Sequence, residues 1–134
     1  MHGLHLTADL HGCPSDHAAM SDAALLRALC LREVEAAGLH PVGELFHRFA
    51  PAEPGAPSGV TGVVLLAESH LAVHTWPELR GVTLDVYVCN FSTDNRARAQ
   101  ALLDALVAAL RPGRVERQRL QRGRLQAPVG LPGA

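Results

Sequence analysis

Apolar and polar residues follow two periods along this 134-residue chain. A period of two predicts strands at 4–10, 39–49, 60–67, 70–76 and 82–89. Spacings of three and four residues predict helices at about 22–37 and 94–111. The apolar stripe of the first helix comprises Leu26, Cys30, Val34 and Ala37, and that of the second comprises Ala99, Leu102, Leu103, Leu106 and Leu110.

Capping and breaking residues lie where these helices should begin and end. Ser21 is a suitable N-cap for the first helix, and Gly38 a suitable stop after it. Ser92 or Thr93 can cap the second helix. Between the predicted strands, the segment 50–59 contains three prolines and two glycines, so we expect a surface loop there.

The segment 114–125 carries five arginines in twelve residues. We expect an exposed edge strand, because charge on an edge opposes aggregation. An RNA-binding strip is disfavoured, since no aromatic residue lies among the arginines. The order of elements predicts an α+β fold, a two-layer sandwich with a largely antiparallel sheet and two helices on one face. Residues 1–125 should form the single domain and 126–134 a flexible tail.

Composition narrows the classes of function. The net charge of −1 gives no general reason to expect nucleic acid or a membrane as a partner, and we see neither a signal peptide nor a membrane-spanning run. Three widely spaced cysteines, Cys13, Cys30 and Cys89, fit reduced thiols and a cytoplasmic location. All 12 basic residues are arginines, so no lysine is present to bind pyridoxal phosphate or a substrate carbonyl.

The stretch VVLLAESHLAVHTWPE, residues 63–78, breaks its apolar pattern at Glu68, Ser69 and His70. The interruption is either a turn or a centre of chemistry. Ser69 lacks the G-x-S-x-G surroundings of a hydrolase nucleophile. Cys89 and His74 would make a generic thiol–imidazole pair.

The eight histidines raise the question of a metal site. His70 and His74 lie four residues apart, which on a strand separates them by roughly 13 Å. His2 and His5 are close to the N-terminus, and His11 and Cys13 have no second pair of ligands at zinc-like spacing. We therefore expect no metal.

ESHLAVHTWPE, followed by LDVYVC, resembles the short, pyruvoyl-dependent S-adenosylmethionine decarboxylases of bacteria and archaea. FHRF at 46–49, GVTGVV at 59–64 and QRGR near the end extend the resemblance over nearly the whole chain. It implies a proenzyme that cuts itself between Glu68 and Ser69 into a β chain, 1–68, and an α chain, 69–134. Ser69 would become a pyruvoyl group, whose ketone condenses with the substrate amine and acts as the electron sink for decarboxylation.

The resemblance also implies roles for other residues. His74 would serve as a base in processing, with Thr61 at a position where the family usually has serine. Cys89 would return a proton to the substrate after carbon dioxide leaves. A separate set would bind the substrate, with aromatic rings flanking adenine and a carboxylate accepting from ribose: Phe49, Trp76 and Glu78. The expected assembly is a homodimer of αβ units, and the expected product feeds spermidine synthesis.

Two departures from the family pattern leave the substrate open. Val88-Cys89-Asn90 replaces the usual Thr-Cys-Gly, and the loop at 50–59 is longer than the usual link. An ornithine or arginine decarboxylase of the same family is therefore an alternative. A second alternative is a homologue that no longer processes itself and acts as a binding module, against which the intact Glu68, Ser69, His74 and Cys89 argue.

Overall fold

The structure, a computed structural model, describes residues 1–126, 128 and 130. Within them, six strands form one sheet in the order β2-β3-β4-β5-β1-β6, and every neighbouring pair is antiparallel. The strands are β1 (Gly3–His11), β2 (Pro41–Arg48), β3 (Val60–Leu66), β4 (Ser69–Trp76), β5 (Gly81–Cys89) and β6 (Arg114–Arg122). The helices are α1 (Ala23–Ala36) and α2 (Arg96–Leu110), with short 3₁₀ turns η1 (Ala18–Met20) and η2 (Pro77–Leu79).

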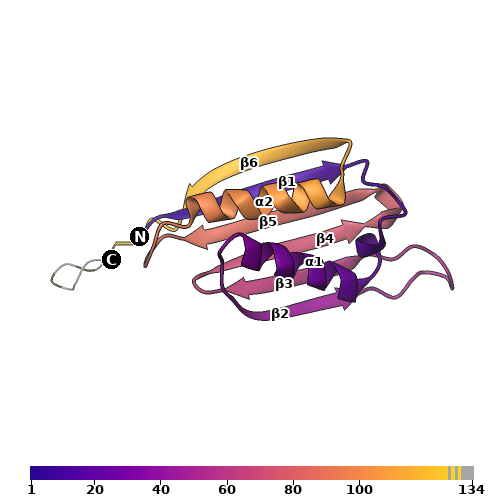
Figure 1. The fold of residues 1–134 in the computed structure, drawn as a ribbon, viewed down its shortest axis with the longest axis horizontal. Coiled ribbons are helices and arrows are strands. Elements are labelled where there is room, and N and C mark those ends of the chain that lie inside the picture. Colours follow the sequence, from indigo (N-terminus) through magenta and orange to yellow (C-terminus); the bar gives the residue numbers. More distant parts are fainter. Residues whose placement is uncertain (127, 129, 131–134) are drawn as a thin grey trace.

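Both α-helices lie on the same face of the sheet (Figure 1). Helix α1 packs on β2 and β3, while α2 packs on β5 and β1, and the two helices contact each other. The predicted α+β two-layer sandwich is therefore confirmed.

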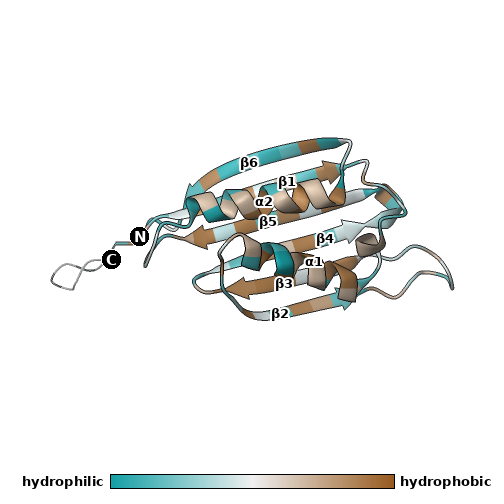
Figure 2. Cartoon of the chain, in the orientation of Figure 1, coloured by the Kyte–Doolittle hydropathy of each residue, from teal (hydrophilic) through white to brown (hydrophobic). Residues whose placement is uncertain are grey.

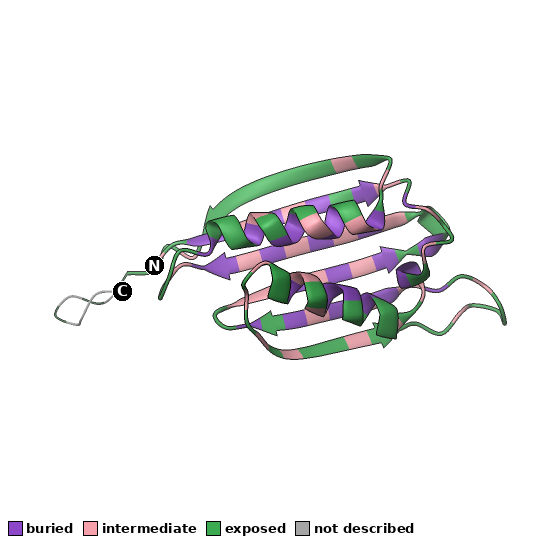
Figure 3. Ribbon diagram, viewed as in Figure 1, coloured by how far each residue is buried: buried purple, intermediate pink, exposed green. Residues whose placement is uncertain are grey.

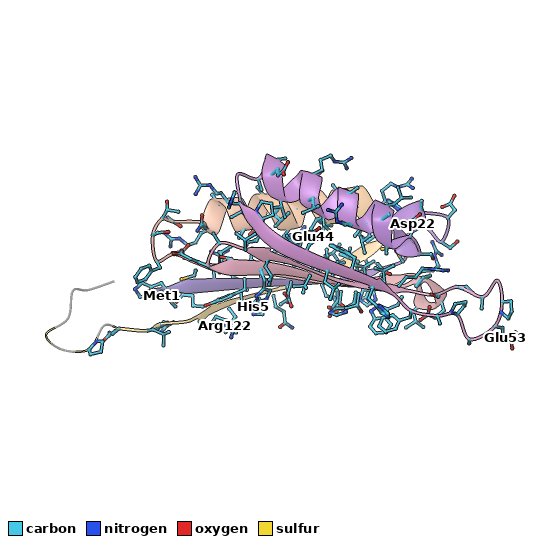
Figure 4. The ribbon with its side chains drawn as sticks, turned by 90° about the horizontal axis from the view of Figure 1, so that it is seen from below. Met1, His5, Asp22, Glu44, Glu53 and Arg122 are labelled. Carbon is cyan, nitrogen blue, oxygen red and sulfur yellow. The ribbon has the colours of Figure 1, made fainter. Side chains whose placement is uncertain are left out.

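The period-two pattern of the strands divides the sheet into two faces. In β1, Leu4, Leu6 and Leu10 are buried beneath the helices, while His5 and Asp9 alternate with them on the other side. Figure 3 shows this alternation along the central strands, and Figure 2 shows brown, apolar segments on those strands beside teal segments along β6. In the part of the chain that is described, no helix covers the second face, which we call the open face (Figure 4).

Two predicted helix caps are wrong, each by a short shift along the chain. Asp22 rather than Ser21 is the N-cap of α1, and its carboxylate accepts from the Leu25 N–H at 3.1 Å. Helix α2 begins after Asn95, beyond Ser92 and Thr93. Asn95 is buried, and its side chain makes no cap bond to the helix but donates to the Cys89 carbonyl at the end of β5.

The two edge strands, β2 and β6, show the features that the sequence predicts for them. β2 contains a register shift between Pro41 and Gly43, where proline interrupts the pattern. β6 is exposed and carries arginines, as predicted for 114–125. Arg117 of β6 pairs with Asp104 of α2 at 2.7 Å, which ties this edge to the helical layer.

None of the helices in the described residues is both long and apolar enough to cross a membrane. Most of the predicted tail, 126–134, lies outside the described residues.

Candidate active site

The polar interruption of the sequence forms the turn between β3 and β4. Ala67 and Glu68 connect the strands, and Leu66 pairs with Ser69 across the hairpin. Glu68 has a φ of 67°, in the left-handed region that costs a non-glycine residue roughly 1–2 kcal/mol. The Glu68–Ser69 peptide bond therefore follows a strained, exposed residue.

Ser69 and Cys89 lie together at one end of the sheet. Ser69 opens β4 and Cys89 closes β5, and the Cys89 backbone N–H donates to Ser69 Oγ at 3.2 Å. Cys89 is only 6% exposed. The structure thus brings three predicted site residues together, since Glu68 is bonded to Ser69.

Two polar residues that the sequence analysis did not assign to the site support this end. The Ser92 hydroxyl donates to Glu68 Oε2 at 3.1 Å. The Asn95 side-chain amide donates to the Cys89 carbonyl at 3.2 Å. These contacts hold the β3–β4 turn and the end of β5 in place. They depend on how the segment 90–95 folds, and no motif in the sequence predicts that fold.

Thr61 and His74 form a second cluster at the other end of β4. They face each other across the β3–β4 ladder, and Thr61 Oγ1 lies 3.0 Å from His74 Nδ1. The threonine hydroxyl can donate to or accept from the ring nitrogen, and this contact orients the imidazole ring.

The three predicted substrate-binding residues gather beside this second cluster. A cavity of about 480 Å³ is lined by Phe49, Trp76 and Glu78 together with Thr61 and His74. Phe49 and Trp76 are 51% and 44% exposed as residues, so a planar ligand can reach their side chains. A cavity of this size accommodates a small molecule.

The loop 50–59 forms the wall of this cavity, and close backbone packing anchors its end. Gly59 lies against the Thr75 carbonyl so closely that a Cβ there would collide with it. The Thr75 hydroxyl accepts from the Val60 N–H at 2.8 Å and donates to the Met20 carbonyl at 2.7 Å. The proline-rich segment is therefore held at the Thr61–His74 end of the sheet.

The two clusters are far apart within one chain. Ser69 and His74 are separated by five residues of the same extended strand, roughly 16 Å. His74 pairs with Thr83, which is six residues, roughly 20 Å, from Cys89. The hypothetical Cys89–His74 pair is thus not formed within a chain, and His74 does not reach its own Ser69.

All three cysteines are free and buried, as expected for reduced thiols. Burial raises the pKa of Cys30 to about 12, so this thiol stays protonated. Burial also raises the pKa of Cys13, although nearby Arg80 opposes the shift. Cys89 is distinguished from both by its contact with the Ser69 hydroxyl.

Comparisons with known proteins identify related sequences. The profile of the family described as S-adenosylmethionine decarboxylase matches residues 4–123. The chain is 36% identical over 121 residues to the S-adenosylmethionine decarboxylase proenzyme of Aquifex aeolicus, covering 90% of this chain and 81% of that one. It is 35% identical over 136 aligned positions to the proenzyme of Parasynechococcus marenigrum, covering 99% and 100%.

A solved structure shows the same fold. The crystal structure of the adenosylmethionine decarboxylase from Aquifex aeolicus superposes with a TM-score of 0.79 at 32% identity, covering 96% of this chain and 97% of that one. Because the family profile matches most of the sequence and the two relatives match over 81% and 100% of their length, this chain belongs to the S-adenosylmethionine decarboxylase family.

Proposed function

We propose that this chain is a proenzyme that cuts itself at Glu68–Ser69 and then decarboxylates S-adenosylmethionine with a pyruvoyl group made from Ser69. The observation that carries this proposal is the geometry of the turn. Glu68 is held in a strained conformation, and the hydroxyl of the next residue is positioned by the Cys89 N–H. Cleavage relieves the strain at Glu68.

The proposed cleavage balances with water as the only added reactant. Ser69 Oγ attacks the Glu68 carbonyl, so that a C–O ester bond forms and the C–N peptide bond breaks. A base then removes the Ser69 α-proton, and the Cβ–Oγ bond breaks as the Glu68 carboxylate leaves. Water replaces the nitrogen of the resulting enamine as ammonia departs. The products are the β chain, 1–68, and the α chain, 69–134.

The surroundings of Ser69 fit the group that this cleavage would produce. A pyruvoyl carbonyl supplies the electron sink that decarboxylation of an α-amino acid requires. The buried Cys89 thiol adjoins Ser69 and would return a proton to the substrate α-carbon. The sequence contains no lysine that could form a Schiff base with a substrate or cofactor carbonyl instead.

We further propose that the active unit is a homodimer in which two open faces pack together. Within one chain, the Thr61–His74 cluster and Ser69 lie at opposite ends of β4. The base that removes the Ser69 α-proton must therefore come from another chain. In a two-fold dimer, His74 of the partner subunit would act as the base at Ser69. Large apolar side chains on or beside the open face are exposed in the single chain and would be covered: Leu45, Leu65, Trp76 and Leu120.

Adenosylmethionine matches the chemistry of the cavity at the Thr61–His74 end. The Phe49 and Trp76 rings offer stacking surfaces for adenine and an attractive face for the sulfonium. The Glu78 carboxylate would accept hydrogen bonds from the ribose hydroxyls. In the proposed dimer this cavity adjoins Ser69 and Cys89 of the partner subunit.

Substrate choice is tested by release of labelled carbon dioxide from adenosylmethionine, ornithine and arginine. We expect turnover on adenosylmethionine alone, and a KM about 10-fold higher for Glu78→Gln, because a neutral amide accepts more weakly from the ribose hydroxyls. Turnover on ornithine or arginine in preference to adenosylmethionine would contradict the proposed substrate while leaving the cleavage reaction intact.

Cys89→Ala should separate processing from turnover. The variant keeps the backbone N–H that contacts Ser69 and should still cleave, whereas its kcat should fall by about 100-fold or more because the proton donor is gone. Cys30→Ala is the control, since that buried, protonated thiol lies in the core. Wild-type kcat in cleaved Cys89→Ala would remove Cys89 from the acid role.

We also propose a cytoplasmic enzyme whose product enters spermidine biosynthesis. Three free, buried thiols support a reducing compartment.

A further inference from the structure

Three side chains from three strands converge on the open face, close to the start of β4. His5 of β1 lies 3.7 Å (Nε2) from Asp85 Oδ2, and His70 of β4 lies 3.4 Å (Nε2) from Asp85 Oδ1. The ligand atoms of all three residues lie within 4.8 Å of one another. None of them has a role in the proposed decarboxylation. Figure 4 shows His5 on the side of the sheet opposite the helices.

Two of the converging atoms are buried and have no hydrogen-bond partner. They are His5 Nε2 and Asp85 Oδ1, and the distances of 3.7 Å and 3.4 Å between the pairs are not those of hydrogen bonds. Buried polar atoms in folded proteins almost always have partners. Two unpaired atoms within one cluster of possible ligand atoms therefore indicate a ligand that contacts them together.

The spacing fits a transition-metal ion. Zinc binds imidazole nitrogen and carboxylate oxygen at about 2.0–2.2 Å, so neighbouring ligand atoms in a tetrahedron are roughly 3.3 Å apart. The two separations end on different oxygens of Asp85 and need to shorten by a few tenths of an ångström to reach that value. The three ligand atoms together lie within 4.8 Å of one another, so the side chains must also draw closer around the ion. We propose that His5, His70 and Asp85 form a binding site for Zn²⁺ or a similar divalent transition-metal ion, with a fourth position open to water.

Arg122 competes with the metal for His5. Its guanidinium lies 3.2 Å from His5 Nδ1 and can only donate, so Nδ1 accepts and Nε2 carries the proton. A metal on Nε2 requires the opposite tautomer, and the guanidinium must therefore turn away. In the single chain Arg122 is exposed, and its guanidinium also lies over the Tyr87 ring, 4.7 Å from the ring centroid (Figure 4). Removing Arg122 should consequently tighten metal binding.

The site also joins two segments that the proposed cleavage would separate. His5 lies in residues 1–68, while His70 and Asp85 lie in residues 69–134. A bound metal would link the two chains directly behind the new N-terminus at residue 69. This consequence rests on the proposed function, whereas metal binding by the intact fold does not.

The test is a calorimetric titration of chelator-treated protein with Zn²⁺, together with the absorption spectrum of the Co²⁺ form. We expect one ion per chain and a cobalt spectrum of nitrogen and oxygen ligation without thiolate bands. Asp85→Asn, which preserves the side-chain shape, and His5→Ala should each weaken binding by about 100-fold or more. His47→Ala should bind normally, and Arg122→Gln should bind more tightly than the wild type.

Thermal unfolding gives a second measure that does not require decarboxylase activity. At a free Zn²⁺ concentration 100 times Kd, the Tm of the wild type should rise by about 8 °C, and that of Asp85→Asn should not change. The inactive Ser69→Ala chain should bind zinc as the wild type does, which keeps this result independent of processing. Absence of saturable binding, or binding that persists in both His5→Ala and Asp85→Asn, would overturn the site.

Discussion

Ser69→Ala is expected to remain a single chain of 14.2 kDa and to release no carbon dioxide from any substrate. Alanine has no hydroxyl to attack the Glu68 carbonyl, and no pyruvoyl group can form without that attack. The loss should be complete, because the same side chain is both the nucleophile of processing and the precursor of the cofactor. Intact-mass spectrometry after prolonged incubation measures the first effect, and labelled carbon dioxide release the second.

Ser92→Ala is the matched control for this variant. It removes a hydroxyl that also contacts the turn, at Glu68 Oε2, but it leaves the proposed nucleophile in place. We expect it to cleave. Cleavage of Ser69→Ala between residues 68 and 69 would show that another group attacks the bond, and it would contradict the proposed route.

The composite site predicts complementation between two inactive variants. Ser69→Ala and His74→Ala should each stay uncut when produced alone. When they are produced together, a mixed dimer has one complete site, made of Ser69 from the His74→Ala chain and His74 from the Ser69→Ala chain. With random pairing, about half of the His74→Ala chains should be cut, and none of the Ser69→Ala chains. Tagged chains of different mass make the two products distinguishable.

The double variant, Ser69→Ala with His74→Ala, tests whether the partner's His74 is responsible for cleavage in the mixed dimer. When it is produced together with His74→Ala, neither chain carries the His74 imidazole, and no cleavage is expected. If the two single variants also fail to complement although mixed dimers form, then His74 acts within its own chain or not at all. That result would contradict a site shared between two chains, but it would leave the proposed role of Ser69 unchanged.

Much of the fold was predictable because burial imposes a period. The alternation in β1 and the stripe on α2 place Leu4 and Leu106 in the core, as the structure has them. Helix starts were less predictable, since several polar residues before each helix are competent caps. Asp22 displaces Ser21 by one position, and Asn95 is used to hold Cys89.

The residues of the candidate site could be picked out through the motif around Glu68 and Ser69, but their arrangement in space could not. Distances across a sheet depend on strand order and register, which the spacing of residues along the chain does not specify. Thus Ser69 and Cys89, twenty residues apart in sequence, are in contact, while Ser69 and His74 are not. His5 is close to the N-terminus, and its position in the sequence does not indicate a site, yet strand pairing carries β1 into the sheet and places His5 against Asp85.

The central claim is that the chain cuts itself at Glu68–Ser69, and the intact mass of the purified, unmutated protein tests it most directly. The account predicts two species, residues 1–68 ending in a free Glu68 carboxylate and residues 69–134 beginning with a pyruvoyl group that reacts with hydroxylamine. A single chain of 14.2 kDa that resists hydroxylamine and stays uncut over time and across pH would contradict it.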